Sequence, residues 1–249
     1  MAIITNVEKH NSQIVTLTIG DPPFSTWKAG QFLLLSVRQG TEWASEHVYT
    51  ISSAPEEGEV RITVKAAGPS STRLQDAVPG MEVRVRGPMG HFCKDADQQP
   101  RITLIAGGIG ITPFLSLLRH MMRAGTKSQI VLLWANNTAN DIIHREELAA
   151  IAEKLGARIL HVLWKDEDTV NACPCDDGQT CRSGLLNAAT LKEHADLEHA
   201  EVYLCGPPEM HRMTLDIIRS LGTDPARIHT EIMNPAQTPK APATKPAGD

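Results

Sequence analysis

The sequence lacks several features that would each assign a chain to a particular class of protein. It has no apolar run near the roughly 20 residues that a membrane-spanning helix needs. No basic-then-apolar leader is present in residues 1–12, so we expect neither a signal peptide nor a transmembrane segment, and a cytoplasmic location. The net charge is −5, without the basic balance typical of nucleic-acid-binding proteins, so we expect no nucleic-acid partner.

Cysteine is scarce and unevenly placed. The chain has five cysteines, an odd number, which argues against a full disulfide framework. Three of them, Cys173, Cys175 and Cys181, lie in one polar insertion. Three thiolates are one short of the usual zinc or iron–sulfur site. Free thiols or a labile disulfide, a zinc site and a cluster therefore stay open. We predict no metal site, and these three cysteines are the only candidates for one.

Short β-rich segments fill the first part of the chain. Turn residues such as Asp21-Pro22-Pro23 separate them, and one short helix is expected over residues 71–77. Six short strands at these spacings predict an antiparallel β-sandwich or β-barrel over residues 1–98. The predicted strands are Ile3–Val7, Ile14–Ile19, Gln31–Val37, His47–Ser52, Glu59–Lys65 and Glu82–Arg86.

From about residue 99 strands alternate with helices, which predicts an α/β domain with a doubly wound parallel sheet over residues 99–234. The last residues, 235–249, are rich in Pro, Ala, Thr and Lys and are predicted to be a disordered tail. The predicted strands are Ile102–Ala106, Ile130–Trp134, Arg158–Leu163, Glu201–Cys205 and Ile228–Ile232. The first predicted helix begins at Pro113. The other predicted helices are Asp141–Leu155, Asn187–His194 and Glu209–Leu221.

A glycine-rich stretch, Ala-Gly-Gly-Ile-Gly-Ile-Thr-Pro over residues 106–113, lies between a predicted strand and a predicted helix. Glycines let the backbone turn tightly and approach a ligand closely. The N–H groups and the dipole at a helix N-terminus attract a diphosphate, and Pro113 fits the first helical turn. Taken alone, the stretch is also consistent with a glycine-rich turn that binds nothing.

Three other segments carry polar or reactive residues at the ends of elements: His47–Pro55, Gly68–Leu74 and Leu204–Met210. A Tyr-Thr pair can stack on a flat ring and hydrogen-bond its edge. Small hydroxyl residues at a helix start can bind phosphate, and a strand C-terminus in a parallel sheet is where ligands lie. Each also has a plain interpretation: an alternating strand, a helix cap and a buried structural cysteine.

Together and in this order, the four segments resemble the ferredoxin–NADP reductase family over nearly the whole chain, from about residue 2 to Met233. Lys28-Ala-Gly-Gln-Phe is similar to the turn before the family's third strand. Residues 107–113 resemble its Gly-Gly-x-Gly-x-Thr-Pro loop, and residues 205–208 resemble its Cys-Gly-Pro-Pro motif. The resemblance implies a flavin-binding barrel joined to an NAD(P)-binding domain, with the nicotinamide over the flavin in the cleft between them.

The resemblance also implies the site residues. Thr50, Cys205 and Glu231 are implied as catalytic. The implied cofactor-binding residues on the flavin side are His47, Val48, Tyr49, Thr50, Val64, Lys65, Gly68, Ser71 and Thr72. Those on the nicotinamide side are Gly107, Gly108, Gly110, Thr112, Pro113, Cys205, Gly206 and Pro207.

Three departures from the family pattern refine these expectations. The family's flavin motif corresponds to His47–Thr50, where His47 replaces the usual Arg. This replacement makes the motif more similar to its version in ferric reductases and NADPH oxidases. Because those enzymes use FAD, we expect FAD rather than FMN, with Arg73 supplying the missing charge. Glu231-Ile232-Met233 replaces a Glu-x-aromatic ending. Asn137 stands where relatives often have Arg, which favours NADH over NADPH.

The expected function is an NAD(P)H-dependent flavoprotein reductase that passes electrons to a separate redox protein or domain containing haem or iron–sulfur. The chain has neither a ferredoxin-type cysteine set nor membrane helices to hold haem, so the acceptor must be separate, and a membrane partner stays possible. Two alternatives remain open: a free-standing reductase of small acceptors such as ferric chelates or quinones, and a non-catalytic regulatory subunit that retains the fold.

Overall fold

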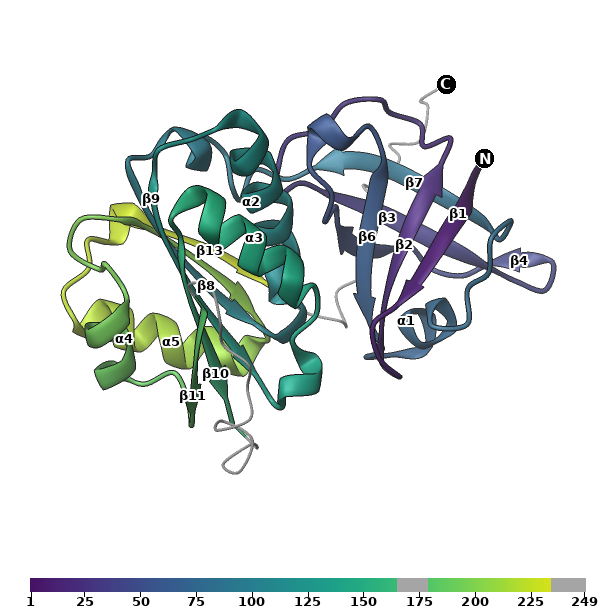
Figure 1. Ribbon diagram of the computed structural model, residues 1–249. Coiled ribbons are helices and arrows are strands. Elements are labelled where there is room, and N and C mark those ends of the chain that lie inside the picture. The colour runs from purple at the N-terminus through teal and green to yellow at the C-terminus, as the bar shows by residue number, and fades with distance from the viewer. Residues whose placement is uncertain (165–178, 234–249) are drawn as a thin grey trace, which may run out of the picture.

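The computed structural model describes residues 1–164 and 179–233, with Gln39 described by its backbone alone. An N-terminal domain built on an antiparallel sheet lies beside a C-terminal domain built on a parallel sheet (Figure 1). This agrees with the predicted fold class. No helix in the described ranges is both long and apolar enough to cross a membrane.

The antiparallel sheet follows the order β4-β3-β7-β1-β2-β6, and β5 pairs with β3. An isolated bridge between Ile51 and Ile62 joins the end of β5 to β6, so the sheet curls back on itself as a barrel. Leu17, Leu33 and Ile62 are fully buried in its core. The elements are β1 (Ala2–Lys9), β2 (Ile14–Gly20), β3 (Phe32–Gln39), β4 (Glu42–Trp43), β5 (His47–Thr50), β6 (Val60–Lys65), α1 (Pro69–Leu74) and β7 (Glu82–Met89).

The parallel sheet follows the order β11-β10-β9-β8-β12-β13. Its strands are β8 (Arg101–Gly107), β9 (Gln129–Asn136), β10 (Arg158–Leu163), β11 (Gln179–Ser183), β12 (Glu201–Gly206) and β13 (Ile228–Ile232). The α-helices are α2 (Thr112–Ala124), α3 (Arg145–Leu155), α4 (Ala188–His194) and α5 (Pro208–Ser220). The 3₁₀ turns η3 (Gly108–Ile111) and η4 (Ala139–Asp141) precede α2 and α3.

Helices cover both faces of the parallel sheet because successive side chains on each strand point to opposite faces. On β8, Leu104 packs in one core cluster with residues of α2 and α3, such as Phe114 and Leu148. The next residue, Ile105, packs in a second cluster with Leu191 of α4 and Ile218 of α5. This explains why the parallel strands read as almost continuous apolar runs in the sequence.

The strand order reverses between β8 and β12. From β8 the chain adds β9, β10 and β11 to one side, and it then returns to place β12 and β13 on the other side. Ligands of open α/β sheets bind at such a switch point, outside the carboxyl ends of the strands. Here those ends carry Gly107 and Gly206, so the topology brings two of the predicted motifs to the same point.

Several predicted boundaries were wrong. The predicted helix over 71–77 is α1 at Pro69–Leu74. The helix predicted from Asp141 begins at Arg145, because Asp141 accepts hydrogen bonds from Thr138 and ends a separate 3₁₀ turn. Strand β11 was not predicted, since its residues, Gln-Thr-Cys-Arg-Ser, include no aliphatic or aromatic side chain. The predicted tail, 235–249, lies outside the described residues.

Candidate active site

Glycines at the switch point allow two backbone segments to touch. A Cβ on Gly110 would collide with the carbonyl oxygen of Cys205 and would lie 2.9 Å from the Cα of Gly206. A Cβ on Gly107 would lie 2.9 Å from Pro207 and would collide with the Met210 sulfur. The two predicted motifs, residues 106–113 and 205–208, therefore form one surface of closely packed backbone.

Side chains around the glycine-rich loop hold its shape. The indole N–H of Trp134, on the neighbouring strand β9, donates to the Gly108 carbonyl at 2.9 Å. The Thr112 hydroxyl donates to the Ile109 carbonyl at 3.1 Å, so it stabilises the helix start. Pro113 lies in the first turn of α2, where no intrahelical N–H bond is lost. The remaining N–H groups of this turn point toward the carboxyl edge of the sheet, where an anion is favoured.

Cys205 and Glu231 lie side by side as paired residues of β12 and β13. Cys205 is fully buried, and burial followed by the nearby Glu231 carboxylate raises the pKa of its thiol, so the thiol is protonated at neutral pH. Burial raises the pKa of Glu231 to about 7. One carboxyl oxygen of Glu231, Oε2, is buried and has no hydrogen-bond partner in the part of the chain that the structure describes. The pair therefore offers a thiol and an unsatisfied carboxyl group next to the glycine-rich surface.

The flavin motif forms β5, in register with β3: Thr50 faces Phe32, and Tyr49 faces Leu33. Thr50 is buried, His47 is partly exposed and Val48 is 40% exposed. Burial raises the pKa of Tyr49 to about 12, so its phenol remains a hydrogen-bond donor. The strand thus presents a hydroxyl and a ring close to its end.

The predicted phosphate-binding helix is α1. The Ser71 hydroxyl accepts from the backbone N–H groups of Ala67 and Gly68 at 2.9 and 3.0 Å, so it caps the chain before the helix. Simple capping, one of the two interpretations of this segment, is therefore present. Gly68 has open space around its Cα, where an added Cβ would meet no atom within 4 Å.

Val64 and Lys65 are in β6, which lies against η3 of the C-terminal domain. The Val64 side chain is buried in the barrel core, and its carbonyl accepts from Gln75 after α1 at 3.3 Å. The Lys65 ammonium pairs with Asp141 across the domain boundary at 2.9 Å. Both side chains therefore serve the barrel or the domain interface, so a ligand would meet these two residues through their backbone groups.

The sequence analysis missed Ser116 and Arg119, two buried polar residues of α2 that join the domains. The Ser116 hydroxyl donates to the Ser53 carbonyl at 2.6 Å, and an Arg119 N–H donates to the Ser52 carbonyl at 2.6 Å. Arg119 is only 1% exposed and binds both carboxyl oxygens of Glu147 at 2.7 and 2.6 Å. The residues just after the flavin motif are thereby fixed to the helix that follows the glycine-rich loop. Their signal in the sequence was a Ser and an Arg three residues apart on a mostly apolar helix.

The cysteine insertion is only partly described. Cys173 and Cys175 lie outside the described residues, whereas Cys181 is in β11 and is disulfide-bonded. A disulfide sulfur is not a thiolate ligand, so Cys181 is not available to a metal while this bond is present. Of the alternatives weighed for this cysteine, the disulfide is the one present.

Comparison with known proteins agrees with this geometry. Residues 1–108 match an FAD-binding domain family, and residues 104–216 match the oxidoreductase NAD-binding domain family. The chain contains an FAD-binding domain followed by an oxidoreductase NAD-binding domain. The match to the FAD-binding domain covers the barrel and the flavin motif, and the match to the NAD-binding domain covers both glycine-containing motifs. The expected cofactor, FAD, agrees with this assignment.

Individual relatives are distant. The chain is 26% identical over 240 residues to a flavohemoprotein of Bacillus subtilis, covering 94% of this chain and 59% of that protein. It is 28% identical over 226 residues to the reductase component of propane 2-monooxygenase from Rhodococcus jostii, covering 88% and 60%. The flavohem-like FAD/NAD-binding domain of nitric oxide dioxygenase from Vibrio cholerae has the same fold, with a TM-score of 0.80, 22% identity and coverage of 93% and 98%.

The chain spans about three fifths of the length of these first two relatives. The matched part is the FAD- and NAD-binding unit.

Proposed function

We propose that the chain is an NAD(P)H:acceptor oxidoreductase that passes electrons from NADH or NADPH through FAD to a separate iron-containing protein or domain. One observation carries this proposal. The segment that contains the flavin-binding motif is hydrogen-bonded to α2, the helix that follows the glycine-rich nucleotide-binding loop. Ser116 of α2 donates to the Ser53 carbonyl, and Arg119 donates to the Ser52 carbonyl. A cytoplasmic location remains a prediction, as do the domain limits 1–98 and 99–234.

Buried polar atoms without protein partners support a ligand at the switch point. Besides Glu231 Oε2, both side-chain atoms of the Asn136 amide are buried without partners among the described residues. Asn136 ends β9, next to Gly107 at the end of β8. Buried polar groups are rarely left unpaired, so a polar ligand along this edge accounts for both residues. A dinucleotide has the amide, hydroxyl and phosphate groups required.

Each predicted residue then has a role in placing the two rings. FAD, when bound, would supply the redox chemistry that connects a two-electron donor to a one-electron acceptor. Thr50 and Tyr49 orient the flavin ring through a hydroxyl and an aromatic face. Cys205 fills the space beside the nicotinamide, and Glu231 accepts or donates a hydrogen bond at its polar edge. Because the protein contributes positioning, displacements near 1 Å should be costly.

The proposed acceptor follows from chemistry and from the relatives. Haem and iron–sulfur centres accept one electron at a time, whereas nicotinamides give two, and a flavin connects the two processes. One relative is a flavohemoprotein, and another is the reductase component of a monooxygenase. A free-standing reductase of small acceptors is the competing function, and a non-catalytic subunit that retains the fold is the third.

A visible spectrum of the purified chain, recorded before and after NADH, separates the enzyme from the non-catalytic subunit. Bound flavin that NADH bleaches supports the enzyme. Steady-state turnover then separates the two enzymes. We expect turnover with ferric chelates or quinones to be much slower than flavin reduction. Turnover with a small acceptor that equals the rate of flavin reduction, with no protein partner co-purifying, would refute the separate acceptor.

Flavin retention is expected to depend on the start of α1. Replacing Ser71 and Thr72 together by glutamate should release FAD, because two carboxylates would repel its phosphates. The readout is flavin absorbance per chain after gel filtration. The matched control, Ser71→Ala with Thr72→Val, removes the hydroxyls without adding charge and should keep more FAD. Full FAD content in the glutamate variant would refute phosphate binding at α1.

Coenzyme preference is expected to favour NADH. Asn137, directly after β9, is exposed and uncharged, whereas binding a 2′-phosphate normally requires Arg or Lys there. The specificity constant should be higher for NADH, and Asn137→Arg should raise the constant for NADPH. The matched control is Asn140→Arg on the same turn. A parental enzyme that prefers NADPH would contradict this prediction.

A further inference from the structure

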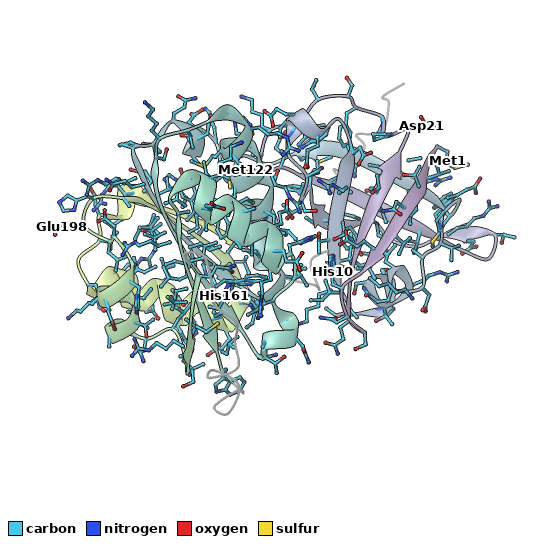
Figure 2. All side chains as sticks on the ribbon, viewed as in Figure 1. Met1, His10, Asp21, Met122, His161 and Glu198 are labelled. Atoms are coloured by element: carbon cyan, nitrogen blue, oxygen red, sulfur yellow. The ribbon has the colours of Figure 1, made fainter. Side chains whose placement is uncertain are left out.

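A histidine-rich cluster lies at the domain boundary, away from the motifs described above. Glu8 and His10 come from the end of β1 and its turn toward β2, and His144 precedes α3. Among the residues that the structure describes, each of these three side chains has one potential metal-ligand atom within 4.8 Å of the other two. Figure 2 labels His10 between the two domains.

Both imidazoles are enclosed. The side chains of His10 and His144 are each 8% exposed, and their rings meet edge to face with centroids 4.4 Å apart. The Nε2 of His144 is buried and has no hydrogen-bond partner within residues 1–164 and 179–233. Two buried histidines in contact, one with an unsatisfied nitrogen, have no evident role as an ordinary core pair.

We propose that Glu8, His10 and His144 form a zinc site that joins the two domains. Two imidazole nitrogens and one carboxylate oxygen are a donor set that zinc accepts, with water as a fourth ligand. Fe²⁺ also binds two histidines and a carboxylate but needs several open positions, so the enclosure of both imidazoles favours zinc, which needs only one.

The surrounding polar contacts resemble the outer shell of a zinc site, in which each ligating histidine uses its other nitrogen for a neighbour. The Nε2 of His10 lies 2.8 Å from the Thr16 hydroxyl, which leaves Nδ1, 3.7 Å from the Glu8 carboxylate, for the metal. The Nδ1 of His144 lies 3.4 Å from the Glu147 carboxylate, which leaves the unpartnered Nε2. The pattern thus selects one nitrogen of each ring as the ligand.

The charges around the cluster also suit a cation. The charge of Arg119 is offset by its two contacts with Glu147. Glu8, 52% exposed, supplies a carboxylate at the solvent side of the cluster.

The loop that carries His144 is already attached to the barrel beside this cluster. The Asn11 amide donates to the Asn140 carbonyl at 2.9 Å, and Lys65 pairs with Asp141 at 2.9 Å. A metal bound to Glu8, His10 and His144 would connect the same two segments, the β1–β2 turn and the residues before α3. Zinc should therefore stabilise the contact between the domains.

The test uses the flavin-loaded full chain after chelator treatment, titrated with zinc against a chromophoric chelator. We expect one zinc per chain, and a rise in Tm of roughly 5–10 °C at zinc a hundredfold above Kd. His144→Asn should abolish this binding. His144 has a φ of 54° and is the N-cap residue of α3. Asn adopts positive φ more readily than most residues and is a favourable N-cap, so the variant should fold. Glu8→Gln should weaken binding by about tenfold or more.

Two controls test other zinc ligands. His199→Ala removes a surface histidine, 59% exposed, that lies near Asp196 and Glu198. Cys173→Ser with Cys175→Ser removes two cysteines of the polar insertion. Both controls should bind zinc like the parental chain. No stoichiometric zinc in the parental chain, unchanged binding in His144→Asn, or loss of binding in either control would overturn the proposal.

Discussion

Replacing Gly110 by alanine should leave FAD bound but slow its reduction by NADH about a hundredfold or more. The added methyl group would clash with the carbonyl oxygen of Cys205 and with the Cα of Gly206. Neither backbone segment can yield as a flexible side chain can, so the glycine-rich loop and the end of β12 must separate. The nicotinamide would then lie at the wrong height over the flavin, while the flavin motif on β5 is not touched.

Stopped-flow bleaching of flavin absorbance measures this rate, and flavin content per chain measures retention. The matched control is Gly125→Asn at the other end of the same helix. Gly125 has a φ of 67°, which Asn tolerates, and an added Cβ would meet no atom within 4 Å. The control should reduce its flavin at the parental rate. A parental rate in Gly110→Ala would show that the close contact between the two motifs does not position the nicotinamide.

Replacing Arg119 by methionine should lower the free energy of unfolding by about 3–5 kcal/mol. The substitution removes the donor to the Ser52 carbonyl and both contacts to the Glu147 carboxylate. Although burial raises the pKa of Glu147, the hydrogen bonds from Arg119 hold it below its usual value, so the carboxylate stays ionised and loses its partner. An unpaired charge in a half-buried position is costly.

Urea unfolding followed by circular dichroism measures the loss. The double variant Arg119→Met with Glu147→Gln should recover part of it, because it removes the charge left unpaired. Arg212→Ala is the surface control: Arg212 is 64% exposed and pairs with Glu209 on the same helix, so no measurable change is expected. Equal stabilities of Arg119→Met and the parental chain would show that this buried contact contributes nothing to the fold.

Local patterns were sufficient to predict most elements of this fold. The apolar runs of β8, β9, β10 and β12 and the glycine-rich loop between β8 and α2 each have a signal within a few residues. Strand β11 lacks such a signal, because its residues are polar and pair with β10 at the edge of the sheet. The start of α3 was misplaced because Asp141 bonds back to Thr138 instead of beginning the helix.

The site was predictable only in its local parts. Cys205 and Glu231 each belong to a short motif, but their side-by-side placement is a result of strand register. Arg119 bonds to residues 28 and 67 positions away, and no pattern around residue 119 identifies those partners. Likewise, the ligands proposed for zinc come from two domains. Contacts of this kind depend on how the domains pack, which periodicity and motif spacing do not describe.

The attachment of the Ser52 and Ser53 carbonyls to α2 has a thermodynamic consequence. The glycine-rich loop begins this helix, and the chain next to the flavin motif is hydrogen-bonded to its middle. A ligand that shifts α2 at one of these points therefore also changes the binding site at the other point. Flavin affinity and dinucleotide affinity should be linked, and because linkage is reciprocal, the factor by which flavin changes dinucleotide binding must equal the factor by which the dinucleotide changes flavin binding.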